Sequence, residues 1–409
     1  MLNLKAGFFA IIVPWALCAA VQADCPLGDL NRDCRVDTAD LLLFADEWLA
    51  QTETPADLNH SGCVDGLDLA LLADHWQDTG CPIVINEILA HAHAEASDWI
   101  ELYNVSSIPV DVGGWFLSDT AGDLFRYQIP AGTTVDPCGY LVLYETIHFA
   151  SPFDPGVSTP FAFSENGDAA YLYSGDDPNF PDCVVSELFG ASETSYSFGR
   201  HFGSTGACDF VTMSELTPGK ANAYPLVGPV VIDEIMYHPA ADGDAEYVEL
   251  LNISNAPVVL FDYASGEPWR LIDDSGIDFR FPTDVPVLIS SGEHVLLVRD
   301  LAAVRQCYNV PAGAIVFDWG SGKLANQGET LRLLKPGDVD DRGVRYWIEV
   351  DRISYSDGSH GDGFPGGIDP WPPAADGDGP SLNRLFPSRY GNDPNNWHAT
   401  IPTPGSVND

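Results

Sequence analysis

Two short stretches of the sequence place oxygen-bearing side chains at every second or third position. The first, "DLNRDCRVDTAD", begins at Asp29, and the second, "DLNHSGCVDGLD", begins at Asp57, 28 residues later. Ca2+ takes six to eight oxygen ligands at about 2.3–2.6 Å, and alternate side chains of a tightly curled loop supply them. The spacing therefore predicts two calcium-binding loops.

Numbering each stretch as a twelve-residue calcium loop assigns the ligands. Position 7 offers only its backbone carbonyl, and position 12 is aspartate in both loops, where an EF-hand has glutamate. Position 6, at the sharp turn, is Gly62 in the second loop but Cys34 in the first. The predicted ligands are Asp29, Asn31, Asp33, Arg35, Asp37 and Asp40 in the first loop and Asp57, Asn59, Ser61, Cys63, Asp65 and Asp68 in the second.

A leucine-rich helix is expected directly after each loop, in "ADLLLFADEWL" and in "LDLALLADHW". Position 12 would lie in its first turn, and the valine at position 8 of each loop (Val36 and Val64) would pack beneath the loop. The alternative is a pair of acidic turns that precede helices without binding a metal. The repeated spacing favours the metal.

Two loop–helix units with aspartate at position 12, and with no helix entering the first loop, resemble the type I dockerin module over roughly residues 25–81. The resemblance implies a module that needs Ca2+ to fold and that binds a cohesin on another protein. In that family positions 10 and 11 of each repeat carry much of the partner choice, and here these are Thr38 and Ala39, then Gly66 and Leu67. Ordinary helix-start chemistry is the alternative for these four residues.

Charge and the N-terminal sequence indicate an exported protein. The chain has 60 acidic against 18 basic residues, a formal net charge of −42, which argues against binding nucleic acid or an anionic membrane surface. Residues 1–23 combine Lys5, an apolar run and small residues before Ala23, which predicts a cleaved signal peptide and no membrane anchor. The eight remaining cysteines favour disulfides. Among several possible pairings we expect Cys25–Cys81 and Cys183–Cys208.

Beyond residue 81 the chain consists of short alternating runs broken by glycine, proline and aspartate, the pattern of a β-sandwich. Its motifs occur twice: "VINEIL" and "VIDEIM", "DWIELYN" and "EYVELLN", and the closing "LTPGKAN" and "PTPGSVN". This order resembles the lamin tail domain, an immunoglobulin-like sandwich. We therefore predict a mainly β protein: signal peptide 1–23, a small helical calcium module at 24–82, and two lamin-tail sandwiches at 83–223 and 230–409.

Several residues of the predicted sandwiches could be catalytic or metal-binding residues. Glu101 and Glu249 could form a catalytic pair, but alternation with apolar residues favours a solvent-facing side of a strand. "HAHAE", beginning at His91, could chelate a metal through His91 and His93, although a polar loop fits better. Asn104 and Asn252 open N-x-S sequons that we interpret as turns. The residues 356–381 insertion of the second copy is predicted to be a surface loop, with a third Ca2+ site as the lesser alternative. Ile85, Ile88, Trp99, Ile100, Leu102 and Tyr103 are predicted core or strand-face residues.

The modules together account for almost every residue, and the motifs of nucleotide-binding loops, serine hydrolases and zinc proteases are missing from the sequence. We therefore expect a secreted, non-enzymatic, Ca2+-dependent attachment protein whose helical module binds a cohesin-like partner and whose sandwiches bind a polysaccharide or a protein. One alternative is an exported hydrolase of carbohydrates or phosphoesters with an unrecognised site. Another is a structural surface or matrix component.

Overall fold

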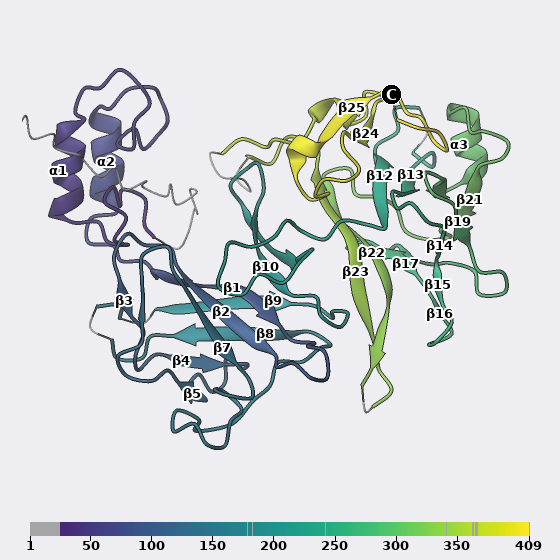
Figure 1. Ribbon diagram of the computed structural model, residues 1–409. Coiled ribbons are helices and arrows are strands. Elements are labelled where there is room, and N and C mark those ends of the chain that lie inside the picture. The colour runs from purple at the N-terminus through teal and green to yellow at the C-terminus, as the bar shows by residue number, and fades with distance from the viewer. Residues whose placement is uncertain are drawn as a thin grey trace, which may run out of the picture.

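The computed structural model describes residues 25–408, apart from 178, 182, 242, 341, 362–363 and 365–366. The predicted signal peptide at residues 1–23 lies outside these residues. The described chain is mainly β, as expected, with a small helical module at its N-terminal end followed by two β-structured bodies (Figure 1). Among the described helices, none is long and apolar enough to cross a membrane.

The helical module contains two nine-residue helices, α1 (Thr38–Asp46) and α2 (Gly66–Asp74), which lie side by side (Figure 1). Its core is small and consists of Val36, Phe44, Ala56, Val64 and Leu72. Each position-8 valine is bonded to the chain that follows the other repeat's helix: Val36 N–H donates to Asp78, and Val64 N–H donates to Ala50. These two hydrogen bonds link each loop to the other repeat. Both valines are fully buried, as predicted.

The first sandwich has two main sheets. One has the strand order β11-β10-β1-β2-β7, the other has the order β5-β4-β8-β9, and β3 pairs with β6 beside them. The strands are β1 (Ile83–Leu89), β2 (Trp99–Asn104), β3 (Val110–Asp111), β4 (Phe116–Ser118), β5 (Tyr127–Gln128), β6 (Thr134–Val135), β7 (Tyr140–Tyr144), β8 (Asp168–Tyr173), β9 (Val184–Phe189), β10 (Phe198–Phe202) and β11 (Cys208–Thr212).

The second sandwich repeats this order and adds one parallel edge strand. Its sheets run β21-β20-β13-β12-β24-β25 and β18-β17-β22-β23, with the pairs β14-β19 and β15-β16 beside them. The elements are β12 (Val230–Met236), β13 (Tyr247–Asn252), β14 (Val258–Val259), β15 (Phe261–Asp262), β16 (Glu267–Pro268), β17 (Arg270–Ile272), β18 (Asp278–Arg280), β19 (Leu288–Ile289), β20 (His294–Val298), α3 (Leu301–Cys307), β21 (Ile315–Asp318), β22 (Gly328–Val339), β23 (Arg345–Ser356), η2 (Pro373–Ala375), β24 (Ser381–Arg384), η3 (Pro394–Asn396) and β25 (Trp397–Thr400).

The first two strands of each sandwich have the same irregularity at the same place. The pairing of β1 with β2 shifts register between Ile85 and Glu87, and the pairing of β12 with β13 shifts between Ile232 and Glu234. A bulge of this kind lets residues three apart reach the same face of the sheet. Ile85 and Ile88 therefore both enter the first core, and Ile232 and Ile235 both enter the second. All six predicted core or strand-face residues are buried.

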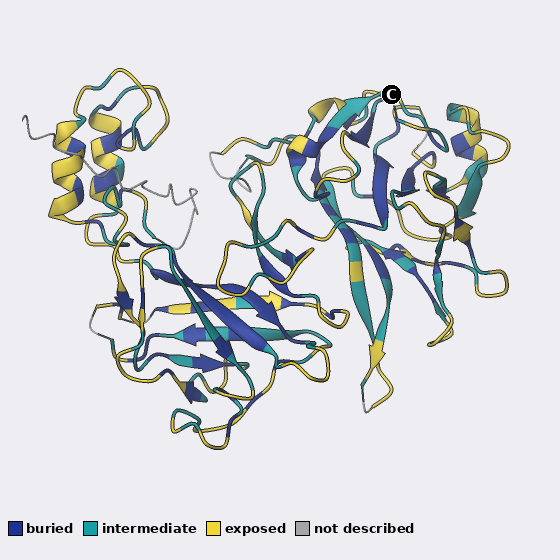
Figure 2. Ribbon diagram, viewed as in Figure 1, coloured by how far each residue is buried: buried dark blue, intermediate teal, exposed yellow. Residues whose placement is uncertain are grey.

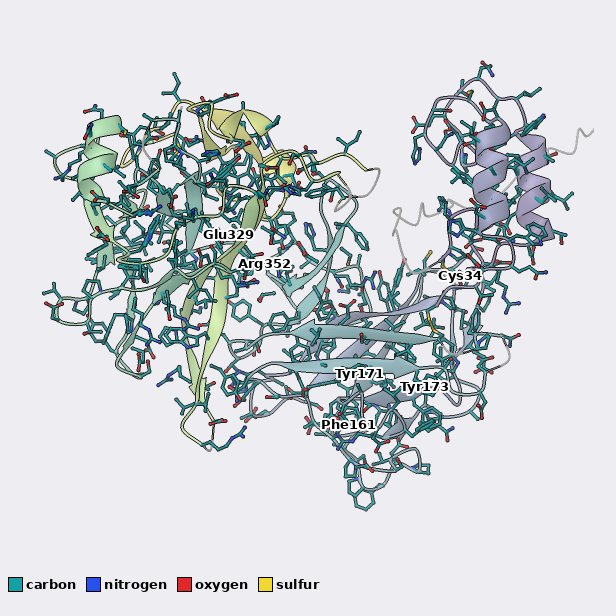
Figure 3. The ribbon with its side chains drawn as sticks, turned by 180° about the vertical axis from the view of Figure 1, so that it is seen from behind. Cys34, Phe161, Tyr171, Tyr173, Glu329 and Arg352 are labelled. Atoms are coloured by element: carbon teal, nitrogen blue, oxygen red, sulfur yellow. A yellow bond between two sulfur atoms is a disulfide. The ribbon has the colours of Figure 1, made fainter. Side chains whose placement is uncertain are left out.

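Each sandwich has its own core, and the two sandwiches meet at a polar contact. Asp209 on β11 accepts hydrogen bonds from Arg352 (3.0 Å), the Tyr390 hydroxyl (2.7 Å) and Asn392 (2.9 Å) of the second sandwich. Arg352 lies on β23 where the long β22–β23 hairpin passes the first sandwich (Figure 3). Tyr390 also packs with Val211 and Met213.

The disulfides differ from both expected pairings. Cys25 is bonded to Cys34, and Cys81 is bonded to Cys183, with Cα–Cα distances of 4.5 and 5.5 Å. The two ends of the module do lie close together, since Gly80 N–H donates to the Cys34 carbonyl. Cys25 nevertheless pairs with Cys34 in the turn of the first loop, and Cys81, which directly precedes β1, pairs with Cys183 at the start of β9. Cys81–Cys183 therefore ties the helical module's exit to the first sandwich.

Removing the Cys81–Cys183 bond by the double substitution Cys81→Ser and Cys183→Ser should destabilise the first sandwich. The bond closes a loop with a sequence separation of 102, for which the chain-entropy account gives about 4.7 kcal/mol, and the loss of a native disulfide typically costs about 2–5 kcal/mol. Urea unfolding of the oxidised protein measures this. Cys307→Ser is the control, because Cys307 is in neither disulfide. An unchanged unfolding midpoint in the double variant would contradict the structure.

Candidate calcium and docking module

The position-12 aspartates close both loops from inside. Asp40 and Asp68 are fully buried, and each accepts a hydrogen bond from the N–H of the preceding N-cap aspartate (Asp37 or Asp65) at 2.8 Å. The other oxygen of each reaches back to the start of its loop, where Asn31 or Asn59 donates its N–H. Each carboxylate thus joins the two ends of its loop to the first turn of the helix.

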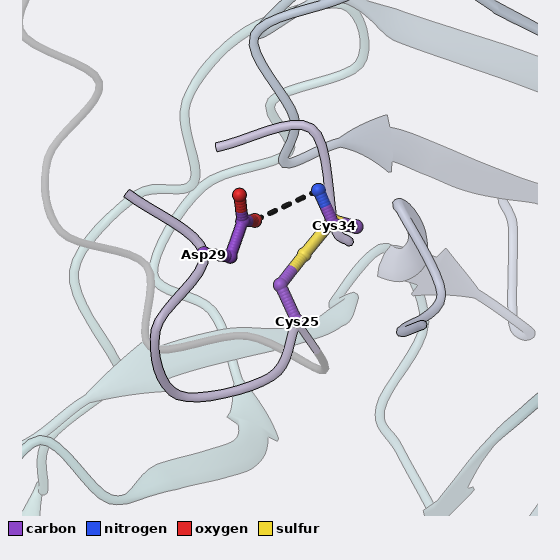
Figure 4. A group of neighbouring side chains, drawn as sticks. All are labelled: Cys25, Asp29 and Cys34. Atoms are coloured by element: carbon purple, nitrogen blue, oxygen red, sulfur yellow. Dashed lines mark hydrogen bonds between the residues drawn. A yellow bond between two sulfur atoms is a disulfide. The ribbon is translucent and has the colours of Figure 1, made fainter. Parts of the chain in front are cut away.

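The position-1 aspartates organise the turn of each loop in the same way. Asp29 accepts N–H hydrogen bonds from Asp33 (3.0 Å) and Cys34 (2.7 Å), the second of which is drawn in Figure 4. Asp57 accepts the matching pair from Ser61 (3.0 Å) and Gly62 (2.8 Å). In each loop the two bonds curl the backbone around the position-1 carboxylate.

Cys34 adopts the conformation that glycine has in the second loop. Its φ is 64°, against 85° for Gly62, and position 4 is also left-handed in both loops, with φ of 61° at Arg32 and 54° at His60. A residue with a Cβ is uncommon at such a φ. The disulfide to Cys25 holds Cys34 in place there (Figure 4), so the first loop keeps the calcium-loop turn without glycine.

The first loop is electrostatically strained without a cation. Burial, together with the nearby charges of Asp33 and Asp40, raises the pKa of Asp29 to about 6 against the pull of its N–H donors. Cys25 and Cys34 share a disulfide and offer no thiolate there. The donor set is therefore made of oxygens, which suits Ca2+ rather than a thiophilic metal.

The remaining predicted ligands follow the loop pattern. Asn31 and Asn59 each accept an N–H from position 5, at 3.0 Å in both loops. The Arg35 side chain turns away to the first sandwich, where it donates to the carbonyl of Asn179 and lies over the Phe180 ring. At position 7 Arg35 can therefore offer a loop-bound ion only its backbone carbonyl.

The four predicted partner-binding residues lie together with exposed leucines at the helix starts. Thr38, Ala39, Gly66 and Leu67 are all exposed. The outward faces of α1 and α2 are largely exposed in Figure 2, although they are rich in leucine. The exposed large apolar side chains of the module are Leu27, Leu41, Leu42, Leu43, Trp48, Leu49, Leu67, Leu69 and Trp76.

The prediction that Glu101 and Glu249 face solvent is wrong. Both are fully buried, and their neighbours across the strand pair, Glu87 and Glu234, are fully buried too. In each sandwich the closing "TPGxxN" segment lies over this face of the sheet. The glutamate strands and the closing "TPGxxN" segment occur together in both copies of the sequence. This joint repetition is the sequence feature that could have indicated a contact between them.

The contacts in the first sandwich form a lock between the opening strands and the closing segment. Glu87 accepts hydrogen bonds from the Ser197 hydroxyl and from the N–H and hydroxyl of Thr217. Glu101 accepts from Asn86 and from the N–H of Gly219. With their oxygens engaged in this way, these acids hold the C-terminal segment in place and are not available as a catalytic pair.

The second sandwich has the same lock with one exchange. Glu234 binds Thr403, Ser381 and Tyr247, and Glu249 binds the N–H of Gly405. Asp233 stands where the first copy has Asn86 and so cannot donate to the glutamate. His294, on the neighbouring strand, donates to Glu249 instead at 2.5 Å.

The other residues read for chemistry have structural roles. The two ring nitrogens of His91 form hydrogen bonds with the Ser192 carbonyl and the Thr194 hydroxyl. Both nitrogens therefore already have partners, and neither partner is His93. Asn104 and Asn252 end strands β2 and β13 and are fully buried. Their side chains hold the following turns, accepting from Ser106 or Ser254. Neither has a positive φ, so they serve these turns through their side chains and not through a left-handed backbone.

Comparison with protein-family models assigns the first two parts of the chain. Residues 27–77 match the dockerin type I domain. Residues 77–179 match the lamin tail domain. Both resemblances seen in the sequence are thereby confirmed for these segments, whereas a search of curated proteins finds no match. Dockerin domains bind calcium and cohesins and occur in exported proteins.

The lock of the lamin tail domain should make its stability depend on pH. Burial raises the pKa of Glu101 to about 7, against the N–H of Gly219 and the amide of Asn86, which lower it. The folded state then keeps a proton that the unfolded state releases near pH 4.5, so the unfolding free energy falls as the pH rises from about 4.5 to 7, by at most about 3 kcal/mol. Hydrogen exchange in β1 and β2, corrected for the intrinsic rate, measures the effect.

Glu101→Gln removes this titrating group and should make the pH dependence shallower, leaving the part that Asp98, Glu145 and Asp168 contribute through their own raised pKa values. Glu95→Gln, which changes an exposed acid in the β1–β2 loop, should leave it as in the wild type. The assignment fails if Glu101→Gln and the wild type lose protection equally as the pH rises.

Proposed function

We propose that this protein is a secreted, non-enzymatic attachment protein, in which a calcium-loaded dockerin module binds a cohesin-like partner and the sandwiches present a second binding surface. The observation that carries the proposal is the exposed apolar face of a module that also has two complete sets of calcium-loop oxygens. A face with this many exposed leucines and tryptophans marks an interaction site.

Each loop holds one Ca2+ ion in this proposal. The ligands are Asp29, Asn31, Asp33, Asp37 and Asp40 with the Arg35 carbonyl, and Asp57, Asn59, Ser61, Asp65 and Asp68 with the Cys63 carbonyl. The ion neutralises the carboxylates gathered in the loop, and its binding energy adds to the stability of a module with a small core. Calcium therefore keeps the helix starts, and the residues Thr38, Ala39, Gly66 and Leu67 on them, in a binding-competent arrangement.

Residues 230–409 act as a second lamin tail unit in this proposal. The order of strands in both sheets, the bulge in the first strand pair and the glutamate lock support it. The buried, hydrogen-bonded state of Glu101 and Glu249 disfavours the alternative of a hydrolase that uses them. A polysaccharide or a protein remains the proposed ligand class of the sandwiches.

Substituting the first ligand of either loop should remove one Ca2+ ion. Calorimetric titration of the full chain should give two strong sites in the wild type and one in Asp29→Ala or in Asp57→Ala, because position 1 both binds the ion and curls the loop. The matched controls are Asp46→Ala and Asp74→Ala, which change exposed aspartates at the ends of α1 and α2. Equal stoichiometry in all five proteins would refute the ligand assignment.

Docking should require both calcium and the apolar helix face. Against a panel of cohesin modules, Leu42→Asp and Leu67→Asp should each weaken binding at least tenfold, about 1.4 kcal/mol, since each buries a charge in the interface. Leu188→Asp is the control, because Leu188 is an exposed leucine of β9 in the first sandwich. Binding that survives a chelator, or that all three variants share with the wild type, would favour a structural role for the module instead.

A further inference from the structure

The insertion of the second sandwich gathers three metal-binding side chains far from the calcium module. One ligand atom each of Asp357, His360 and Asp369 lies within 4.8 Å of the other two. Residues 361 and 367 of the insertion lie very close together, since a Cβ on Gly361 would lie only 2.3 Å from the carbonyl oxygen of Gly367. Glycine at this position therefore lets the two ends of the loop approach and brings the three side chains together.

Neighbouring groups donate hydrogen bonds that hold both carboxylates of the cluster in position. The Ser356 hydroxyl donates to Asp369 at 2.5 Å, and the N–H of His360 donates to the same oxygen at 3.0 Å. Asp357 accepts the N–H of Ser359 at 2.8 Å. Hydrogen bonds of this kind orient the ligands of metal sites.

A buried hydroxyl points to a ligand at this cluster. Tyr237 is fully buried, and within the described part of the chain its hydroxyl has no hydrogen-bond partner. Leaving such a group unsatisfied is unfavourable, because burial removes the hydrogen bonds that it would make to water. The Tyr237 ring packs against the Tyr355 ring, with centroids 4.8 Å apart, and Tyr355 directly precedes Ser356 and Asp357 in the chain. Tyr237 therefore lies next to the end of β23 from which the cluster begins. Burial first, and then the charges of Asp376, Asp357 and Asp369, raise the pKa of its hydroxyl. A cation among them would give the tyrosine oxygen a partner.

The first sandwich provides an internal comparison. Its opening motif "VINEIL" is followed by Ala90 at the position of Tyr237, and its sequence has no counterpart of the insertion. The tyrosine and the acid–histidine cluster therefore occur together in one copy, while the shared lock and strand order occur in both. Neither feature is needed for the sandwich fold itself.

We propose that Asp357, His360 and Asp369, with the Tyr237 oxygen, form a binding site for one divalent transition-metal ion of the Zn2+ type. Two carboxylates and one imidazole suit such ions, whereas Ca2+ is bound by oxygens alone. In the structure His360 Nδ1 lies 3.1 Å from Asp357. The metal takes the place of a proton between them, and it fixes the insertion to the end of β12.

Zn2+ titration of the full-length protein tests the site. The protein is first saturated with Ca2+ to fill the dockerin loops, and its thiols are alkylated so that cysteines do not bind the metal. Calorimetry should then show one strong Zn2+ site, and Co2+ at the same site should give visible absorption bands typical of a protein ligand field.

His360→Ala should weaken this site at least tenfold, and Asp369→Asn and Tyr237→Phe should weaken it as well. His360 is exposed, so its removal leaves the core intact. His93→Ala, which changes an exposed histidine of the first sandwich, should bind Zn2+ like the wild type. Zn2+ binding of equal affinity and stoichiometry in His360→Ala and the wild type overturns the proposal. The proposal also fails if the saturating Ca2+ prevents Zn2+ from binding, because the site would then prefer Ca2+.

Discussion

Buried carboxylates that accept N–H groups from two or more separate segments stabilise both the helical module and the sandwiches of this protein. Asp40 and Asp68 each join the two ends of a calcium loop to a helix. Glu87 and Glu234 each join the opening strand of a sandwich to its closing segment. A buried carboxylate is costly unless it is bonded, so each site is stable only when the segment that supplies its donors is in place. Because each buried carboxylate needs these donors, only the closed arrangement, in which both segments are in contact, is stable.

The two kinds of carboxylate site differ in what compensates their charge. In the two sandwiches, hydroxyls, amide groups and N–H groups donate to the carboxylate oxygens, and burial shifts the pKa of Glu101 upward. In the first loop Asp33 and Asp40 lie close enough to Asp29 to raise its pKa, although backbone N–H groups and the Asn31 amide donate to these carboxylates. A bound cation would relieve this repulsion, so the proposed calcium loops would gain stability from a metal, whereas the locks gain it from protonation and packing.

The exchange of Asn86 for Asp233 shows how one copy of the sandwich kept its lock with a different residue. The amide donor is lost, and His294 replaces it from the neighbouring strand. Burial lowers the pKa of His294, but Glu249 and Asp233 outweigh it and raise the pKa, which favours the charged imidazole. The first copy thus uses a neutral donor and the second an ionisable one for the same mechanical purpose.

Local sequence determined the curled loop before each helix, the helices themselves, the strands and their repetition, because residue spacing, capping aspartates and alternation are properties of short segments. The predicted burial of Val36, Val64 and Ile85 rested on such local patterns. Tertiary structure decided the disulfide partners and the environment of Glu101 and Glu249. Alternation along a strand shows that two faces differ, but whether the polar face meets water depends on what else covers it. Here the covering segment lies more than a hundred residues away in the chain, at Thr217 and Gly219, and only the folded sandwich brings it over the sheet.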